Sequence, residues 1–224
     1  MSRDQLHSHA RGLGMASERS RRRLVERLRQ KGVADERVLE AMERVQRHRF
    51  VDEAMASRAY DDTALPIGHS QTISQPYVVA HMTHLLLGQS VPERVLEVGT
   101  GSGYQAAVLA ELVPLVYSVE RIPALYDRAR RRLQELGYRN VRLRQSDGSI
   151  GLPEYGPFDG ILVTAGGEEI PRPLIDQLAD GGRLVAPVGP RHAQHIFRIT
   201  RRGASLDWQK LDAVTFVPLI VGEQ

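Results

Sequence analysis

The sequence predicts one α/β domain with a doubly wound, mostly parallel sheet, an N-terminal helical extension and an antiparallel C-terminal hairpin. After Pro92, strand-like apolar segments alternate with helical ones, which is typical of a parallel sheet covered by helices on both faces. A glycine-rich turn joins the first of these strands to the next helix. Near the C-terminus two strand-like runs are joined tightly around Gly203, which indicates a hairpin at the sheet edge.

The N-terminal part reads as a tail followed by helices. Residues 1–17 lack periodicity and are expected to be disordered. Apolar residues then recur at helical spacing up to Gly32, a natural stop, and Asp35 is the expected N-cap of a second helix. Residues 60–76 are punctuated by prolines and glycines and predict neither a helix nor a regular strand.

A third helix is expected from Pro76 to Leu87, because proline is tolerated at the first helical position, and Gly88 is expected to end it. Strands are then predicted at Arg94–Val98, Leu115–Glu120, Val141–Gln145, Phe158–Thr164 and Arg183–Val188. Helices are predicted at Tyr104–Leu112, Pro123–Leu136 and Pro173–Leu178, with Gly137 and Gly181 as C-terminal caps. The closing hairpin is predicted from His195–Arg201 and Leu206–Leu219.

Composition narrows the class of protein. Of 224 residues, 42% are hydrophobic and 25% charged, as in ordinary globular proteins. The chain has no cysteine, which excludes disulfides and cysteine-based zinc sites. No apolar stretch approaches the ~20 residues that span a bilayer, and the polar, Arg-rich N-terminus does not read as a secretory signal. We therefore expect a cytoplasmic protein with no membrane partner.

Charge and histidine spacing argue against two further classes of site. The net charge of +3 and the pI near 9.4 are far from those of a dedicated nucleic-acid binder, so no nucleic-acid partner is expected. Two basic runs, Arg19–Arg23 and Arg128–Arg132, are expected to be solvated helix faces. His81 and His84 have helical spacing, but no cysteine or carboxylate cluster completes a metal site, so none is expected.

The turn Gly99-Thr100-Gly101-Ser102-Gly103 follows Glu97 at the end of a strand and opens a helix. Glycines let the backbone turn tightly and approach a ligand closely. In a dinucleotide fingerprint, G-x-G-x-x-G, a helix N-terminus meets a pyrophosphate. Here the order is G-x-G-x-G with no added basic residue, which suits an adenosine joined to an amino acid. The spacing favours S-adenosylmethionine, whose product is S-adenosylhomocysteine.

Acidic residues after the next two strands complete this pattern. Glu120 is placed to accept hydrogen bonds from ribose hydroxyls. Asp147, in Ser146-Asp147-Gly148, would accept from the adenine amino group, and the alternative is a plain Asp-Gly turn. The expected cofactor-binding residues are Gly99, Thr100, Gly101, Ser102, Gly103, Glu120, Asp147 and Gly148.

The segment Leu65–Pro76, which contains Thr72-Ile73-Ser74-Gln75-Pro76, closely resembles the signature of the protein-L-isoaspartate O-methyltransferases. The likeness spans roughly residue 20 to the end. It continues at Val95–Tyr104, Ser118–Arg121, Phe158-Asp159, Val163–Ala165, Gly181–Val185 and Phe216–Leu219. The glycine turn is shared by many methyltransferases, whereas the Thr72–Pro76 run is far more specific to this family.

The resemblance implies a Rossmann-like class I methyltransferase fold and a repair activity. The methyl group of S-adenosylmethionine would pass to the free α-carboxylate of L-isoaspartyl residues in damaged proteins, and the ester would then close to a succinimide without the enzyme. Ser74 would be the active-site residue, and Thr72, Ile73 and Ser74 would line the place where substrate and cofactor meet. Because a carboxylate is already ionised at neutral pH, Ser74 would position it by a hydrogen bond and no general base is needed. The alternative for Ser74 is an ordinary helix N-cap.

These expectations define the organisation of the chain. One domain spans residues 18–224, with a helical extension and active-site loop in 18–90 and the cofactor-binding sheet in 91–224. The expected partners are isoaspartyl proteins and peptides, and the chain is expected to be a monomer. The sequence departs from the family in two places. Ser70 stands where glycine is usual. Gly166-Gly167 begin a stretch where the family commonly has alanine and prolines, and these two glycines are expected to loosen their loop.

Two other functions stay open from the residues alone. A methyltransferase acting on RNA or a small molecule would draw on the basic runs. An N6-type nucleic-acid enzyme, however, would carry Asn/Asp-Pro-Pro-aromatic after the fourth strand, where this chain has Thr164–Gly167. A non-catalytic binding module would hold the cofactor without turnover.

Overall fold

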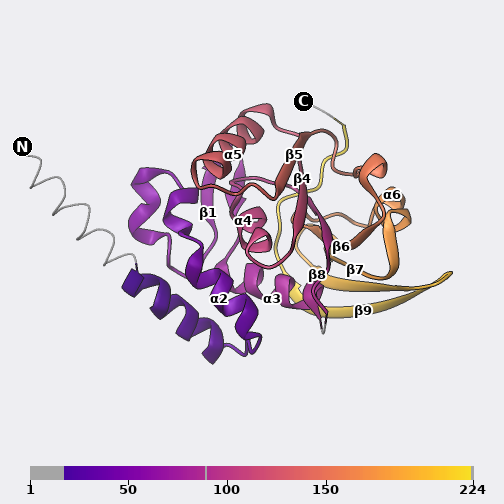
Figure 1. Cartoon of the computed structure of the whole chain (residues 1–224), viewed down its shortest axis with the longest axis horizontal. Coiled ribbons are helices and arrows are strands. Elements are labelled where there is room, and N and C mark those ends of the chain that lie inside the picture. The colour runs from indigo at the N-terminus through magenta and orange to yellow at the C-terminus, as the bar shows by residue number, and fades with distance from the viewer. Residues whose placement is uncertain (1–17, 89, 223–224) are drawn as a thin grey trace, which may run out of the picture.

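In a computed structural model, the structure describes residues 18–88 and 90–222. The expected disordered tail, residues 1–17, lies outside the described residues. One seven-stranded sheet runs through the described part in the order β5-β4-β3-β6-β7-β8-β9, with helices packed on its faces (Figure 1). No helix in this part of the chain combines the length and the apolar character needed to cross a membrane.

Five neighbouring strands are parallel, and the last two are antiparallel. The strands are β3 (Arg94–Val98), β4 (Leu115–Glu120), β5 (Val141–Gln145), β6 (Phe158–Val163), β7 (Leu178–Val188), β8 (Gln194–Arg202) and β9 (Ser205–Val214). From β3 the chain moves to one side through β4 and β5, and then to the other side through β6. Ligands of open α/β sheets bind at such a switch point, outside the carboxyl ends of the strands. The predicted fold class is confirmed.

Helices cover the two faces unequally. One face is covered by α3 (Pro76–Leu87), α4 (Tyr104–Ala110) and α5 (Pro123–Glu135). Outside this layer, α2 (Glu36–Arg44) packs against α3 and α4, and a helix over residues 18–30 belongs to the same buried cluster. The other face is covered by α6 (Arg172–Asp176) and by loops. Short 3-10 helices lie at Arg47–Phe50 (η1), Glu53–Arg58 (η2) and Pro153–Tyr155 (η3). Neighbouring residues of β3, such as Val95 and Leu96, are buried in different clusters, as expected for a strand covered on both faces.

The predicted helix ends are confirmed in the N-terminal half. The carboxylate of Asp35 accepts the Arg37 N–H at 3.1 Å and caps α2. Gly32 has a φ of +94°, and Gly88, with a φ of +56°, is the C-cap of α3. Both left-handed residues end a helix without the steric cost of a Cβ atom.

Two predicted boundaries near the C-terminus are wrong. The helix expected through Leu178 ends at Asp176, because Leu178 already pairs with Phe158 of β6. Gly181 accordingly lies within β7, with a φ of +75°, and caps no helix. The strand expected up to Leu219 ends at Val214, after which the chain runs back over the carboxyl ends of the parallel strands (yellow in Figure 1).

Residues 60–76 contain a small hairpin that the sequence did not predict. Strands β1 (Leu65–Gly68) and β2 (Gln71–Ile73) pair antiparallel. The turn residues His69 and Ser70 have φ values of +52° and +56°, the left-handed pair that a type I′ turn requires. The Asn-Gly pair that usually marks such a turn is absent, so the sequence pattern did not indicate a hairpin here. Ser70 therefore adopts a backbone conformation that glycine tolerates better.

The second basic run, Arg128–Arg132, was predicted to be a solvated helix face, but it is only partly solvated. From α5, Arg132 donates to the Ser102 carbonyl at 2.9 Å and lies over the Phe50 ring. Arg128 donates to the Ile67 carbonyl. These two side chains therefore tie the glycine turn and β1 to α5.

Candidate active site

Three glycines of the turn after β3 have left-handed backbone conformations. Gly99, Gly101 and Gly103 have φ values of +99°, +54° and +88°. A Cβ atom on Gly99 would lie 2.5 Å from Oγ1 of Thr164, a clash that glycine avoids. The N–H groups of Gly99 and Thr100 donate to the Val119 carbonyl at 2.9 and 3.1 Å, which fixes the turn beside the end of β4.

Glu120 closes the turn from the neighbouring strand. Its Oε2 accepts the Gly101 N–H at 2.8 Å, and its Oε1 accepts the Ile122 N–H at 2.9 Å. The carboxylate is almost fully buried and lines the cavity outside the turn. Each oxygen keeps a second lone pair, so Glu120 can still accept from the hydroxyls of a ribose.

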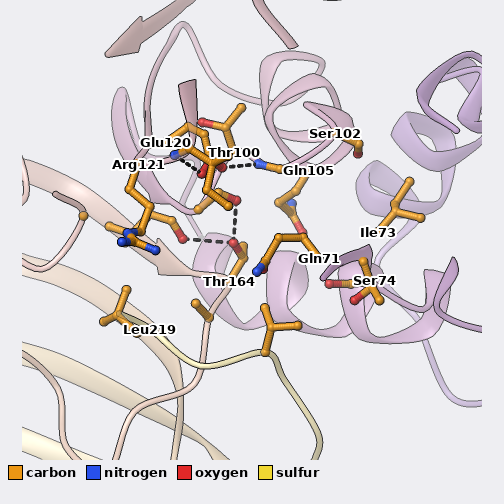
Figure 2. A pocket seen from close by; sticks show the side chains of 18 of the residues that line it. Gln71, Ile73, Ser74, Thr100, Ser102, Gln105, Glu120, Arg121, Thr164 and Leu219 are labelled. Atoms are coloured by element: carbon orange, nitrogen blue, oxygen red, sulfur yellow. Dashed lines mark hydrogen bonds between the residues drawn. The ribbon is translucent and has the colours of Figure 1, made fainter. Parts of the chain in front are cut away.

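A cavity of about 90 Å³ lies at the carboxyl ends of β3, β4 and β6 (Figure 2). The predicted residues that line it are Thr72, Ile73, Ser74, Gly99, Thr100, Gly101, Ser102, Glu120 and Gly148. Two predicted residues do not line it. Gly103 is the N-cap of α4, and Asp147 faces its own turn.

The carboxylate of Asp147 is engaged within the chain. Its Oδ1 accepts the N–H and the hydroxyl of Ser149, both at 2.8 Å, as in a plain Asp-Gly turn. Its Oδ2 accepts the Gly222 N–H at 2.6 Å, and the Gly222 carbonyl accepts from Nε of Arg121 at 3.1 Å. The C-terminal segment is therefore fastened beside the cavity.

Ser74 is not the cap of α3. The N-cap residue is Gln75, which makes no capping bond with its side chain. Asp62 supplies the acceptor, because its Oδ1 receives the Tyr77 N–H at 2.8 Å. The Ser74 hydroxyl makes no hydrogen bond to another described residue, so it is available to a ligand. The N-cap alternative for Ser74 is wrong.

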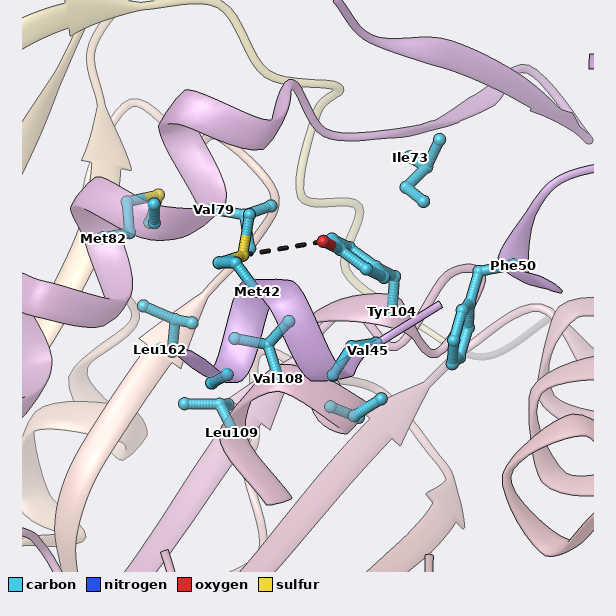
Figure 3. Close-up of a cluster of buried hydrophobic side chains, with 14 of the residues drawn as sticks. Met42, Val45, Phe50, Ile73, Val79, Met82, Tyr104, Val108, Leu109 and Leu162 are labelled. Atoms are coloured by element: carbon cyan, nitrogen blue, oxygen red, sulfur yellow. Dashed lines mark hydrogen bonds between the residues drawn. The ribbon is translucent and has the colours of Figure 1, made fainter. Parts of the chain in front are cut away.

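A second cleft of about 950 Å³ adjoins the first cavity. The two share a wall made of Gln71, Thr72, Ser74, Thr164, Val217, Pro218 and Ile220. The far side of the cleft is lined by α3, by the β7–β8 loop and by the end of β9. Ile73 lies only on the cavity side, packed in the buried cluster with Tyr104 and Phe50 (Figure 3).

Several lining residues were not assigned by the sequence. Thr164 follows β6, and its Oγ1 donates to the carbonyls of Val98 and Gly99 at 2.9 and 2.7 Å. The rule that parallel strands end at one edge could have selected it. No pattern signals that residues 217–220 fold back over the cavity.

The Gly166-Gly167 loop is pinned, so the expectation that glycines loosen it is wrong. The Gly166 N–H donates to the Val217 carbonyl at 2.8 Å, and the Leu219 N–H donates to the Gly166 carbonyl at 2.7 Å. Gly167 likewise accepts from Gly189 at 2.9 Å. A Cβ atom on Gly166 would lie 2.1 Å from Nε2 of the buried Gln194, so glycine here permits close packing.

Glu97 is a fully buried acid beneath the turn. Its Oε2 is hydrogen-bonded to the Ser118 hydroxyl, which lies 2.5 Å from Oγ1 of Thr100. Its Oε1 has no partner among the described residues. Burial raises the pKa of Glu97 to about 8, while Ser118 lowers it and Glu120 raises it further. Burial therefore favours the neutral form of this acid, which is hydrogen-bonded through Ser118 to the glycine turn.

His81 and His84 face different partners. Nε2 of His81 lies 2.9 Å from Oδ2 of Asp212, and Nδ1 of His84 lies 3.3 Å from Oδ2 of Asp35. Among the described residues, no three histidine, cysteine or acidic residues gather as a metal site would require.

The chain is similar over most of its length to known proteins. Residues 19–224 match the family model for Protein-L-isoaspartate(D-aspartate) O-methyltransferase. A protein-L-isoaspartate O-methyltransferase of Halorhodospira halophila is 58% identical over 214 residues, which are 96% of this chain and 97% of that protein. One of Chromobacterium violaceum is 53% identical over 217 residues, 97% of each protein.

Two solved structures share the fold. A protein-L-isoaspartate O-methyltransferase has a TM-score of 0.81 at 30% identity over 88% of this chain, which spans 65% of that solved chain. A Plasmodium falciparum homologue in complex with S-adenosyl-L-homocysteine has a TM-score of 0.75 at 27% identity, over 88% of this chain and 96% of that one.

Proposed function

The chain belongs to the protein-L-isoaspartate O-methyltransferase family, and from that premise we propose that the two adjoining cavities bring S-adenosylmethionine and an isoaspartyl carboxylate together at Ser74. The activity is methylation of isoaspartyl residues, which starts the repair of damaged proteins through a succinimide. The observation that carries the site assignment is the shared wall, where Ser74 faces both cavities.

The residues of the smaller cavity fit the cofactor. Gly99, Gly101 and Gly148 line this cavity without side chains, and Glu120 offers lone pairs to a ribose. When bound, S-adenosylmethionine supplies a methyl group on a positively charged sulfur. No phosphate-binding basic residue is required. Asp147 can accept from the adenine amino group once the Gly222 N–H releases its carboxylate.

The cavity must widen for this ligand. A volume of about 90 Å³ is well below the ~300–1,000 Å³ of typical ligand pockets. Residues 217–220 form one side of it, and the Gly222–Asp147 hydrogen bond holds that side closed. We therefore propose that the C-terminal segment shifts when the cofactor enters.

Ser74 orients the acceptor. The carboxylate of an isoaspartyl residue in the larger cleft is ionised at neutral pH, so no residue has to remove a proton. The Ser74 hydroxyl donates a hydrogen bond to one carboxylate oxygen and aims the other at the methyl carbon. Thr72 and Ile73 complete the wall beside it. The rate gain comes from alignment and from exclusion of water.

A methyl-transfer assay with labelled S-adenosylmethionine tests this function. It compares an isoaspartyl peptide with the same peptide carrying a normal aspartyl residue. We expect base-labile methyl ester on the isoaspartyl peptide only. Ser74→Ala should lose turnover and keep cofactor affinity, whereas Ser205→Ala, on the distant β8–β9 hairpin, should keep both. Equal labelling of both peptides, or cofactor binding without turnover, would contradict the assignment. Full turnover in Ser74→Ala would remove Ser74 from the site.

We propose one domain over residues 18–224 that acts as a monomer in the cytoplasm, without nucleic acid or metal. Light scattering, cell fractionation and activity after chelation test these points. No observation favours RNA as the acceptor, because Arg128 and Arg132 bind carbonyls of the chain itself.

A further inference from the structure

Arg47 is completely buried beneath the loop that carries Ser74. Its Nε donates to the Ala59 carbonyl at 2.8 Å, and one Nη donates to the Ser74 carbonyl at 2.8 Å and weakly to the Thr63 carbonyl at 3.5 Å. These carbonyls span the chain from η2 to the start of α3. A single side chain therefore joins both ends of the active-site loop.

No carboxylate among the described residues forms an ion pair with Arg47, although Asp62, which pairs with Lys31, lies near enough to favour the charge. Within the same residues, the other Nη atom of Arg47 has no hydrogen-bond partner. Its guanidinium lies 4.7 Å from the centre of the Tyr104 ring, whose hydroxyl reaches Met42 in the buried cluster (Figure 3). Burial lowers the pKa of Arg47, because desolvation penalises the charged form. Arginine nevertheless stays protonated in proteins.

A buried, unpaired charge is costly, and an apolar side chain of similar length would fill the same space. The charge lies directly behind the residue that meets an anionic acceptor. We infer that Arg47 is a positioning residue for that acceptor: it fixes the Ser74 carbonyl, and its positive charge favours a carboxylate at the Ser74 hydroxyl. This inference rests on the proposed function.

The expected size of the charge effect follows from the geometry. Bond lengths place the guanidinium within about 8 Å of Ser74 Oγ and within about 11 Å of a carboxylate bonded to it. With an effective dielectric constant of about 20, loss of the charge should weaken acceptor binding about tenfold. Arg47 does not line the cofactor cavity, so cofactor affinity should change little.

Two variants separate the charge from the hydrogen bonds. Arg47→Gln removes the charge and keeps a donor, so we expect KM for an isoaspartyl peptide to rise about tenfold with a smaller change in kcat. Arg47→Lys keeps the charge but loses the planar guanidinium that donates to two carbonyls at once. We therefore expect kcat to fall while KM for the peptide stays near the wild-type value. Arg201→Met is the matched control, because Arg201 holds the Ile175 carbonyl at 2.6 Å, away from both cavities. It should lower only the unfolding midpoint.

If the wild type labels no isoaspartyl peptide, the proposed function fails. If it does label the peptide, an unchanged peptide KM in Arg47→Gln overturns the charge effect. Should Arg47→Gln not fold, Arg47→Lys still decides, because a raised peptide KM or an unchanged kcat contradicts the inference. A loss of stability that leaves peptide KM and kcat unchanged would make Arg47 a structural residue only.

Discussion

Replacing Gly166 by alanine should destabilise the chain through one identifiable contact. The added Cβ would lie 2.1 Å from Nε2 and 2.7 Å from Cδ of Gln194, which is 2% exposed. Gln194 must move, and its Oε1 then loses the Phe216 N–H, now 2.6 Å away. Losing a buried hydrogen bond costs about 1–3 kcal/mol. At about 2 kcal/mol, the unfolding midpoint should fall by about 4–8 °C.

A double-mutant cycle tests this reasoning. Gln194→Ala removes both the obstacle and the hydrogen bond, so Gly166→Ala should cost little in that background, and the two changes should be strongly non-additive. Unfolding in denaturant measures the four free energies, and hydrogen exchange should show the Phe216 amide losing protection in each single variant. The reasoning is refuted if Gly166→Ala costs as much in the Gln194→Ala background as in the wild type.

Three further predictions concern single side chains. Ser70→Gly relieves a left-handed serine and should raise stability by about 0.5–1 kcal/mol in thermal unfolding; a loss would show that the turn is not strained. Burial raises the pKa of Glu97 to about 8, so the contribution of its neutral form to the free energy of unfolding is fully present below about pH 4.5 and is lost as the pH rises through about 8. In denaturant titrations, Glu97→Gln should flatten the dependence of the free energy of unfolding on pH across this range. For Asp35, whose hydrogen bond to Arg37 lowers the pKa to about 2, stabilisation is present above about pH 4 and lost as pH falls through about 2. Asp35→Ala should therefore cost about 1–2 kcal/mol at pH 7 and little at pH 2.

The sequence was most informative where one local rule decides the structure. The strand–turn–helix around Gly99 was placed correctly because glycine spacing and strand ends act over a few residues. The helix caps predicted at Asp35 and Gly88 were correct for the same reason. The prediction that Ser74 lies at the site drew on the family resemblance, and the structure places this residue in the wall between the two cavities.

The errors fall where distant segments decide the local structure. Ser74 is freed from capping by Asp62, a residue that no local pattern connects to α3. Leu178 is extended because β6 pairs with it, although its own sequence favours a helix. Gly166 is held by the chain near Val217, so the intrinsic freedom of glycine does not predict its order. Arg128 and Arg132 belong to a basic run but bind carbonyls of the turn and of β1.

The wall between the two cavities also has a consequence for biosynthesis. It needs residues 71–74, Thr164 and residues 217–220, and the last of these leave the ribosome long after the first. A nascent chain can thus form β1, β2 and the early strands while the proposed cofactor cavity still lacks one side. Under that proposal, cofactor binding stabilises the chain only after residues 217–220 have docked, so by mass action the ligand favours chains in which this segment is in place.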